Sequence, residues 1–176
     1  SDTHIPQAAP ELSEKVARAF EGVDLILHAG DIYVPSCLDW LESVAPVRAV
    51  EMSAAIYFER DPRVAYKQVL EVRGYSIGLV HDLMLRGMVG EVRPGVLRKA
   101  FPEGDSLPAV LRDFFGTQVD IVVFGHTHEL IVEAYQGVLM INPGSPTLPS
   151  PRQSAPTVAI LHLTPGGPEA FIVDLS

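Results

Sequence analysis

The fold is decided by the stretch Val119-Asp120-Ile121-Val122-Val123-Phe124-Gly125-His126-Thr127-His128, in which an apolar run ends in two histidines. The run is rich in β-branched residues and stops at a glycine, which favours a buried strand over a helix. In an extended backbone, residues two positions apart point the same way, so His126 and His128 would present their imidazoles together. We therefore predict a metal site at the end of this strand. Two polar residues in a surface turn are the alternative.

Length and composition restrict the classes of protein that fit. A chain of 176 residues and 19.1 kDa suits one substantial core, so residues 1–176 are predicted to form a single domain. A net charge of −9 and a pI near 5.0 argue against binding to nucleic acid or to an anionic membrane. Cys37 is the only cysteine, which excludes an intramolecular disulfide and a thiolate zinc cluster. Without a membrane-spanning stretch of about 20 apolar residues or a leader, a cytoplasmic protein is expected.

Periodicity predicts alternating helices and strands around this stretch. Helices are expected over 11–20, from an N-cap at Ser36 through Val44, and over 107–115 after a cap at Ser106. Strands are expected over 23–29 and 47–50, in a hairpin over 69–80 around a Gly74-Tyr75 turn, and in hairpins over 130–135 and 138–141, and 157–163 and 170–175. Residues 83–106 are rich in glycine and proline and form an irregular excursion that could act as a lid. Its basic residues are interpreted as a solvated face, with contact to phosphate as the alternative; they are Arg86, Arg93, Arg98 and Lys99.

Other predicted strand ends also carry residue types that bind metals. Asp2 and His4 repeat the spacing of the two histidines, although a frayed polar terminus is the alternative. Asp31 follows the strand over 23–29, and His81 follows a hairpin strand. Open α/β sheets build their sites at the carboxyl ends of strands. His28 lies inside a strand and is interpreted as a core histidine or one that supports a ligand.

Together the strand ends offer two carboxylates and four imidazoles, from Asp2, His4, Asp31, His81, His126 and His128. Nitrogen and oxygen donors without sulfur suit manganese, iron, zinc, cobalt or nickel. Six donors exceed the need of one structural zinc and fit two divalent ions about 3.5–4 Å apart that share a carboxylate. Asp31 is the natural bridge, because it lies between the two groups in the chain and has two oxygens. We predict two metal ions, with manganese the first choice, and catalytic roles for Asp31 and His126.

In this order the motifs resemble those of the calcineurin-like metallophosphoesterases. They are Asp2-Thr3-His4, Gly30-Asp31, His81, Gly125-His126-Thr127-His128 and Asn142-Pro143-Gly144-Ser145. The small bacterial and archaeal phosphodiesterase branch is the best match, and the retromer scaffold subunit of eukaryotes is also similar. The resemblance implies an α/β fold, a four-layer αββα sandwich of two mixed β-sheets flanked by helices, with the family's first strand before Ser1. It also implies that Asp2, His4, Asp31 and His128 hold one metal, while Asp31, His81 and His126 hold the second.

One segment departs from the family's pattern. Where the family has Gly-Asn followed by Asp or His, this chain has Met52-Ser53-Ala54-Ala55. Ser53 is a poor neutral ligand, and Ala55 cannot act as an acid or contact phosphate. The second metal is therefore expected to bind more weakly, or to recruit Glu51 or Glu59 as a substitute.

The leading prediction for function is a hydrolase, a metal-dependent phosphoesterase and most directly a phosphodiesterase, in which hydroxide held by two metals attacks phosphorus. Without a general acid, an activated or diester leaving group is favoured. The alternative is a catalytically weak or inactive scaffold for protein interaction. Exposed apolar residues such as Met84, Leu85 and Met88 would serve it, and packing of these residues in the core is equally compatible with the sequence. A third hypothesis is a metal-holding structural or regulatory domain. The substrate, the native metal and the oligomeric state are left open, and a homodimer is compatible with the sequence.

Overall fold

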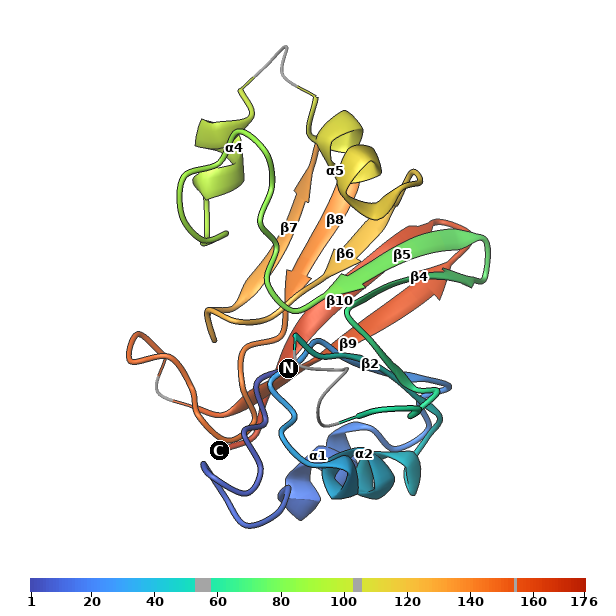
Figure 1. The fold of residues 1–176 in the computed structure, drawn as a ribbon, viewed down its shortest axis with the longest axis vertical. Helices are drawn as coiled ribbons and strands as arrows, with labels where there is room; N and C mark the ends of the chain where they lie inside the picture. The colour runs from blue at the N-terminus through green and yellow to red at the C-terminus, as the bar shows by residue number, and fades with distance from the viewer. Residues whose placement is uncertain (53–57, 103–105, 154) are drawn as a thin grey trace.

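The computed structural model describes residues 1–52, 58–102, 106–153 and 155–176, and they form four layers (Figure 1). The first layer contains α1 (Glu14–Ala19) and α2 (Pro35–Glu42). The second contains β1 (Ile26–His28), β2 (Val47–Val50), β3 (Val64–Ala65), β9 (Thr157–Thr164) and β10 (Gly167–Asp174). The third contains β4 (Lys67–Val72), β5 (Tyr75–Val80), β6 (Ile121–Val123), β7 (Ile131–Tyr135) and β8 (Val138–Asn142). The fourth contains α4 (Val96–Ala100) and α5 (Leu107–Phe115), which confirms the predicted αββα arrangement.

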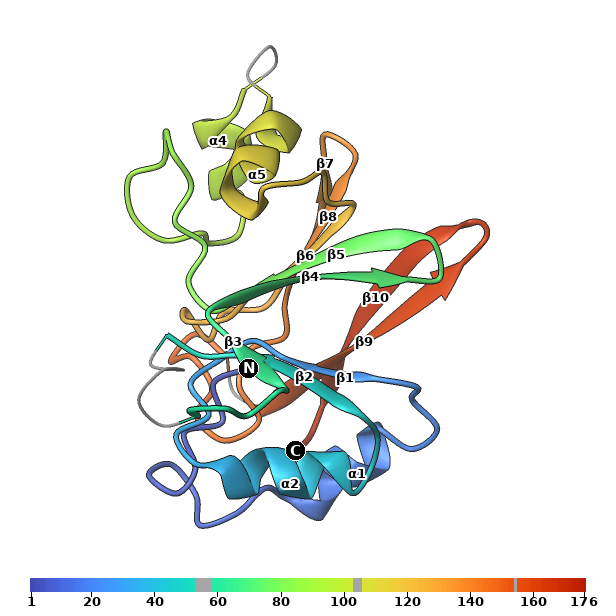
Figure 2. The ribbon, with the colours of Figure 1, turned by 45° about the vertical axis from the view of Figure 1, so that its right-hand side comes forward.

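The five-stranded sheet of the third layer is mixed. Its order is β4-β5-β6-β8-β7, with β5, β6 and β8 parallel and the edge strands β4 and β7 antiparallel to their neighbours. In the second layer, β1, β2 and β3 are parallel, while β9 and β10 form an antiparallel hairpin. Parallel strands place their carboxyl ends at one edge. The loops that follow β1, β5 and β6 therefore gather at the same end of the molecule, on the left in Figure 2.

Three groups of buried side chains fill the three interfaces between these layers. Side chains of α1 and α2 pack on β1 and β2, those of the two sheets pack on each other, and those of α4 and α5 pack on the five-stranded sheet. In β6, Ile121 and Val123 face the other sheet and Val122 faces the helices, as the period of two in a strand requires. Gly78 lets α5 approach β5, because a Cβ there would lie 2.6 Å from the ring of Phe115.

Most predicted elements are present, but α4 lies within residues 83–106, which were predicted to be irregular, and several other elements end at different residues. Ser106 caps α5 by accepting a hydrogen bond from the backbone N–H of Ala109 at 3.2 Å, as expected. The predicted cap at Ser36 is wrong, because α2 begins at Pro35, a residue whose fixed φ suits the first helical turn. The turn predicted at Gly-Tyr is at Arg73-Gly74, where both residues have positive φ. The last hairpin is longer than predicted, since its strands run to Thr164 and resume at Gly167.

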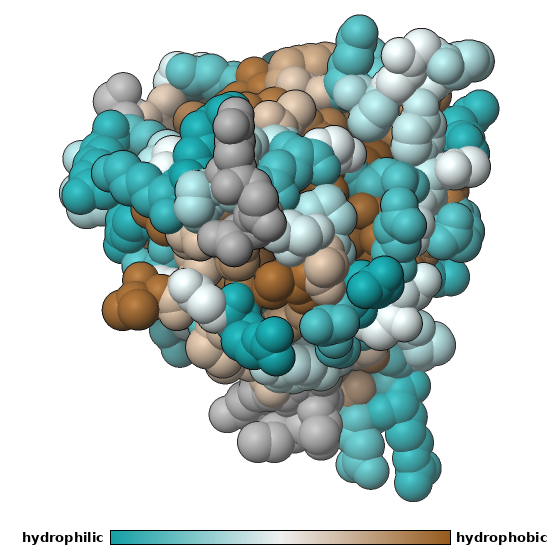
Figure 3. Space-filling view, turned by 90° about the horizontal axis from the view of Figure 1, so that it is seen from above, coloured by the Kyte–Doolittle hydropathy of each residue, from teal (hydrophilic) through white to brown (hydrophobic). Residues whose placement is uncertain are grey.

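The outer face over α4 and α5 carries hydrophilic side chains with separate hydrophobic residues between them (Figure 3). One ion pair on this side joins Arg98 Nε to Glu133 Oε1 at 2.7 Å. The basic residue Arg98 is 59% exposed, which agrees with its interpretation as part of a solvated face. Within the described residues, every helix is too short or too polar to cross a bilayer.

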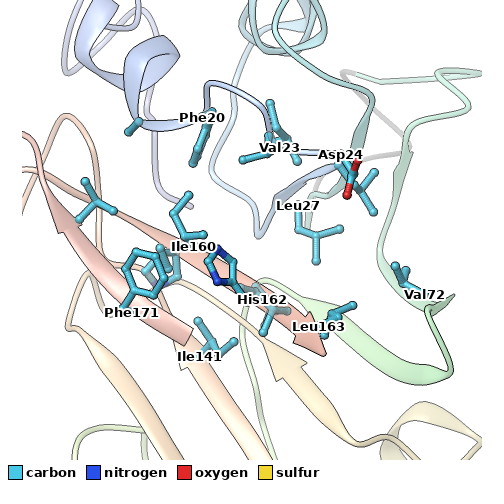
Figure 4. A pocket seen from close by; sticks show the side chains of 18 of the residues that line it. Phe20, Val23, Asp24, Leu27, Val72, Ile141, Ile160, His162, Leu163 and Phe171 are labelled. Carbon is cyan, nitrogen blue, oxygen red and sulfur yellow. The ribbon is translucent and has the colours of Figure 1, made fainter. Parts of the chain in front are cut away.

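A groove of about 710 Å³ separates β1 from the hairpin of β9 and β10. Leu27 of β1 and Leu163 of β9 lie on opposite sides of it, with Ile141 of β8 below (Figure 4). His162 packs edge-on against Phe171, with ring centroids 5.3 Å apart. The described residues that line the groove include none of the six predicted metal ligands, so the groove is separate from the candidate metal centre.

Candidate metal centre

Four of the six predicted ligands form one cluster. Asp2, His4, Asp31 and His128 each offer a donor atom, and these atoms all lie within 4.8 Å of one another. His4 Nε2 is 3.1 Å from His128 Nε2 and 3.4 Å from Asp31 Oδ2, while His128 Nε2 is 3.5 Å from Asp2 Oδ1. The chain start joins the end of β1 because the N–H of Asp2 and the N–H of His4 donate to Gly30 and Asp31, both at 2.8 Å.

The hydrogen bonds of this cluster fit a bound cation. The backbone carbonyl of Leu148 accepts from His128 Nδ1 at 2.5 Å, so a neutral His128 has its lone pair on Nε2, facing a carboxylate oxygen of Asp2. The other oxygen of Asp2, Oδ2, is buried and has no hydrogen-bond partner among the described residues. Burial lowers the pKa of His4, and this effect exceeds the rise caused by the negative charges of Asp31 and Asp2. The lowered pKa keeps the ring of His4 neutral. Lone pairs that face one another in this way suit a divalent metal with nitrogen and oxygen ligands.

The other two predicted ligands lie beside this cluster. His81 is buried, donates from Nδ1 to the carbonyl of Ala29 at 2.8 Å, and places Nε2 3.6 Å from Asp31 Oδ2. The ring of His126 lies edge-on to that of His81, with centroids 5.3 Å apart. Asp31 thus neighbours both His4 and His81, as a bridging carboxylate must. His81 and His126 do not join the four-donor group in the described part of the chain.

The backbone at the site differs from the predicted extended geometry. Positive φ angles between 47° and 72° occur at Asp2, His4, Asp31, His126 and His128. The argument that residues two apart share a strand face is therefore wrong for both pairs, because bends carry the side chains instead. His126 and His128 therefore have different neighbours: His128 contacts Asp2, and His126 lies against His81.

Two glycines and one asparagine of the sequence motifs lie beside the predicted ligands and hold the loops that carry them. A Cβ on Gly30 would lie 2.4 Å from His81 Nδ1, and a Cβ on Gly125 would lie 2.7 Å from Asp2 Oδ2. Asn142 donates to the carbonyl of Gly125 at 2.9 Å and accepts from the N–H of Gly144 at 3.0 Å. The Asn-Pro-Gly-Ser motif therefore braces the histidine loop.

His28 supports the ligands, as interpreted from the sequence. Its Nδ1 accepts from the N–H of Gly30 at 3.2 Å, and its Nε2 donates to Thr3 Oγ1 at 3.2 Å. Complete burial holds the pKa of His28 well below its usual range, because the charged ring would lose its hydration. A neutral His28 thus fixes the segment that carries Asp2 and His4.

The structure does not support Glu51 as the substitute ligand. Its Oε2 accepts from the N–H of Ile32 and its Oε1 from the N–H of Met52, both at 2.9 Å, so both oxygens are used to hold the backbone. Glu59 is exposed. The interpretation of Ser53 and Ala55 falls on residues outside the described ranges.

Four charged residues next to the histidine loop form what we call the rim cluster: Glu91, Arg93, Glu129 and Arg152. Sequence reasoning named Arg93, as part of a solvated face, and missed the other three. Glu91 Oε1 lies 3.4 Å from His126 Nε2, and Glu91 Oε2 lies 2.6 Å from Arg93 Nη2. Glu129 is buried and accepts from both Arg93 and Arg152. Ion pairing with Glu91 and then Glu129 raises the pKa of Arg93. The only sequence signal was the position of Glu129 directly after His128.

A mixed five-stranded sheet faces a second β layer made of a parallel three-stranded sheet and an antiparallel hairpin, and helices cover both outer sides. With nitrogen and oxygen donors at the strand ends, this arrangement defines a metallophosphoesterase-like fold. Residues 1–166 match the family described as "Calcineurin-like phosphoesterase superfamily domain". A "Probable metallophosphoesterase" of Methanothermobacter thermautotrophicus is 36% identical over 166 residues, which cover 93% of this chain and 83% of that protein. A second one, from Methanocaldococcus jannaschii, is 35% identical over 151 residues, covering 85% and 67%. The chain belongs to the calcineurin-like phosphoesterase superfamily.

Solved structures share the fold at low sequence identity. Vps29 from Entamoeba histolytica, crystallised with zinc, has a TM-score of 0.63 and 19% identity, and the match covers 99% of this chain and 96% of that one. An archaeal phosphodiesterase has a TM-score of 0.54 and 18% identity, covering 91% and 90%. These similarities concern the fold alone.

Proposed function

We propose that this protein is a metal-dependent phosphoesterase, and most directly a phosphodiesterase. The observation that carries the proposal is the convergence of donors from Asp2, His4, Asp31 and His128 around opposed lone pairs. In this proposal those four residues hold one divalent ion, and Asp31, His81 and His126 hold the second. Manganese is the first choice, and iron, zinc, nickel and cobalt have the same ligand preferences.

When bound, such a pair of ions supplies a hydroxide nucleophile at neutral pH and neutralises charge on phosphate oxygens. The protein's part is to fix the donors. Carbonyl groups set the ring orientation of His81 and His128. Tyr33 lies 2.7 Å from His4 Nδ1 through its hydroxyl, and burial followed by the charge of Asp31 raises the pKa of Tyr33, so the phenol keeps its proton. Because Ala55 cannot act as a general acid, an activated or diester leaving group is favoured.

The first experiment is hydrolysis of bis(p-nitrophenyl) phosphate by purified protein with added manganese. We expect turnover that falls by more than about 100-fold in His126→Ala, beyond the 10–100-fold loss typical when a partner of a ligand is removed. His162→Ala is the matched control, because His162 lies in the β9–β10 hairpin away from the ligands and should keep full activity. Turnover of p-nitrophenyl phosphate in parallel ranks diesters against monoesters.

A second candidate, a protein-interaction scaffold, is favoured by apolar residues on the loop between β5 and α4. Met84 is 62% exposed and Val89 is fully exposed. Leu85 is buried and Met88 is half-buried against the α4–α5 core, so the alternative, packing in the core, holds for these two. A protein that binds two ions per chain yet hydrolyses no more substrate than His126→Ala would contradict the phosphodiesterase and support the scaffold.

For the compartment, the proposal is the cytoplasm, supported by the single cysteine, Cys37, which is buried as a free thiol. A phosphate ester is the proposed substrate. A homodimer is compatible with these features, and light scattering of the purified protein would decide it.

A further inference from the structure

Each ligand histidine has one ring nitrogen held by a partner outside the donor cluster. For His4, His81 and His128 the held nitrogen is Nδ1, and the partners are the hydroxyl of Tyr33 and the carbonyls of Ala29 and Leu148. Their Nε2 atoms are then the ones that face the carboxylates of the site. A histidine that binds a metal through one nitrogen usually donates its other N–H to a carboxylate, a carbonyl or water.

His126 has the opposite arrangement. Its Nε2 lies 3.4 Å from Glu91 Oε1, which leaves Nδ1 for the site. We propose that Glu91 is a positioning residue that accepts a hydrogen bond from the Nε2–H of His126 and so directs the Nδ1 lone pair to the second metal. This inference rests on the proposed two-metal function. The contact is slightly longer than an ordinary N–H···O bond, and such contacts tighten when a site is loaded.

Glu91 contacts His126 without converging on the other donors. In the described ranges, the one group of three or more His, Cys, Asp or Glu donors within 4.8 Å contains neither residue. Glu91 Oε1 faces Nε2 of His126 and Glu91 Oε2 pairs with Arg93, whereas Asp31 Oδ2 lies near Nε2 of both His4 and His81. The geometry therefore assigns Glu91 to the outer side of the His126 ring.

The rim cluster holds Glu91 in this place. Arg93 pairs with Glu91 through Nη2 and with Glu129 through Nη1, and Glu129 is the residue next to His128. Arg152 Nη1 contacts the same oxygen of Glu129 at 2.5 Å. Two carboxylates and two guanidinium groups balance in charge, so buried Glu129 is compensated. The loop between β5 and α4 is thereby tied to the loop that carries both histidines.

The test compares manganese binding by calorimetry in the wild type, Glu91→Ala, Glu91→Gln and Glu133→Ala. Glu133 is the matched control, because it forms an Arg–Glu pair with Arg98 at 2.7 Å and contacts no predicted ligand. We expect Glu91→Ala to weaken the second ion by about 10–100-fold and leave the first unchanged. Glu91→Gln should lie between, because its amide oxygen still accepts the hydrogen bond without the charge. Glu133→Ala should match the wild type.

A second readout does not require two bound ions. Nitrogen-15 NMR of the metal-free protein should show His126 as the Nε2–H tautomer, and Glu91→Ala should shift it toward the Nδ1–H form. If the wild type binds one ion only, the two-metal function fails, and this tautomer alone decides the role of Glu91. The inference is overturned if Glu91→Ala keeps wild-type binding and tautomer, if Glu133→Ala shows the same loss, or if a manganese-bound crystal structure places Glu91 on the ion.

Discussion

The two halves of the proposed metal centre are built differently. In the first half, the donors of Asp2, His4, Asp31 and His128 already lie within 4.8 Å of one another. In the second half, His81 is fixed and buried, but His126 is 38% exposed and its outer partner is a carboxylate on a surface loop. One half is set by the core of the fold, and the other depends on where a loop lies.

This difference predicts an order of binding. A site whose donors are already in place loses less conformational freedom when it binds, so the first half should take its metal more tightly. The second half lacks the asparagine expected at Ser53, and it must order His126 through the rim cluster. The experiments below test this asymmetry, starting with the largest expected effect.

Replacing Asp2 with asparagine should break the first half. Asp2 is fully buried, its Oδ1 accepts from the N–H of His126 at 3.0 Å, and its Oδ2 has no partner among the described residues. Asn keeps the first contact but replaces the charged oxygen with a donor or a neutral acceptor. We expect the affinity of the tighter manganese site to fall by more than about 100-fold, exceeding the range for partners of ligands. Calorimetry that shows both sites weakened equally would contradict the asymmetry.

Removing metal should lower the stability of the folded protein, because the lone pairs of the first half then face one another with no cation between them. Manganese at about 100 times its dissociation constant stabilises the folded state by about 2.7 kcal/mol. At about 2–4 °C per kcal/mol for a chain of this size, Tm should rise by about 5–11 °C on loading. Differential scanning fluorimetry with chelator and with manganese measures this rise. Asp2→Asn should lose most of it, and an equal rise in that variant would count against the four-donor site.

Gly30→Ala should disturb the second half through His81. The added Cβ would lie 2.4 Å from His81 Nδ1, at a residue with φ of 93°. Gly78→Ala is the matched control, because its Cβ would lie 2.6 Å from the Phe115 ring in the α5 core. Both should lower the free energy of unfolding by about 1–3 kcal/mol in urea titrations. Only Gly30→Ala should also weaken the second metal, and weakening by both would mean that general loosening is the cause.

Acid should destabilise the metal-free protein through His28. The folded pKa lies well below the unfolded value of about 6.5, so below that pH the unfolded chain binds more protons than the folded one. The free energy of unfolding should therefore fall by up to about 1.4 kcal/mol per pH unit below 6.5. Urea titrations at pH 7.5, 6.0 and 5.0 measure the slope. His28→Gln removes the titrating ring and offers one amide donor and one amide acceptor in its place, so its slope should be shallower; an unchanged slope would place the titration elsewhere.

The parts of the fold that sequence predicted were those set by local pattern. The β-branched run 119–123 indicates a buried strand, and the period of apolar residues in 107–115 indicates a helix with one face toward a core; the packing follows both. Metal-binding residues at strand ends could be predicted to meet, since parallel strands end at one edge. Ser36 was misjudged because a capping residue and a proline one position earlier compete for the same helix start.

The rest of the site depends on contacts that no local pattern contains. Glu91 lies 35 positions from His126 in a segment without periodicity, and its position follows from the arginine that joins it to Glu129. Glu51 has the charge of a ligand, yet its two carboxylate oxygens accept hydrogen bonds from the backbone N–H groups of Ile32 and Met52. The bends at the ligand residues arise from pairing across the chain, such as Asp2 with Gly30, which the sequence does not reveal.

Five proposed donor residues have positive φ angles, a backbone conformation that lowers thermal stability at the positions that the proposed chemistry needs: Asp2, His4, Asp31, His126 and His128. A residue with a side chain costs roughly 1–2 kcal/mol in this conformation, whereas glycine adopts it freely. At each of these positions, losing the ligand to glycine relieves strain in the same step. Substitution by glycine therefore relieves backbone strain while it removes a proposed donor, so strain and metal binding oppose each other at these five positions.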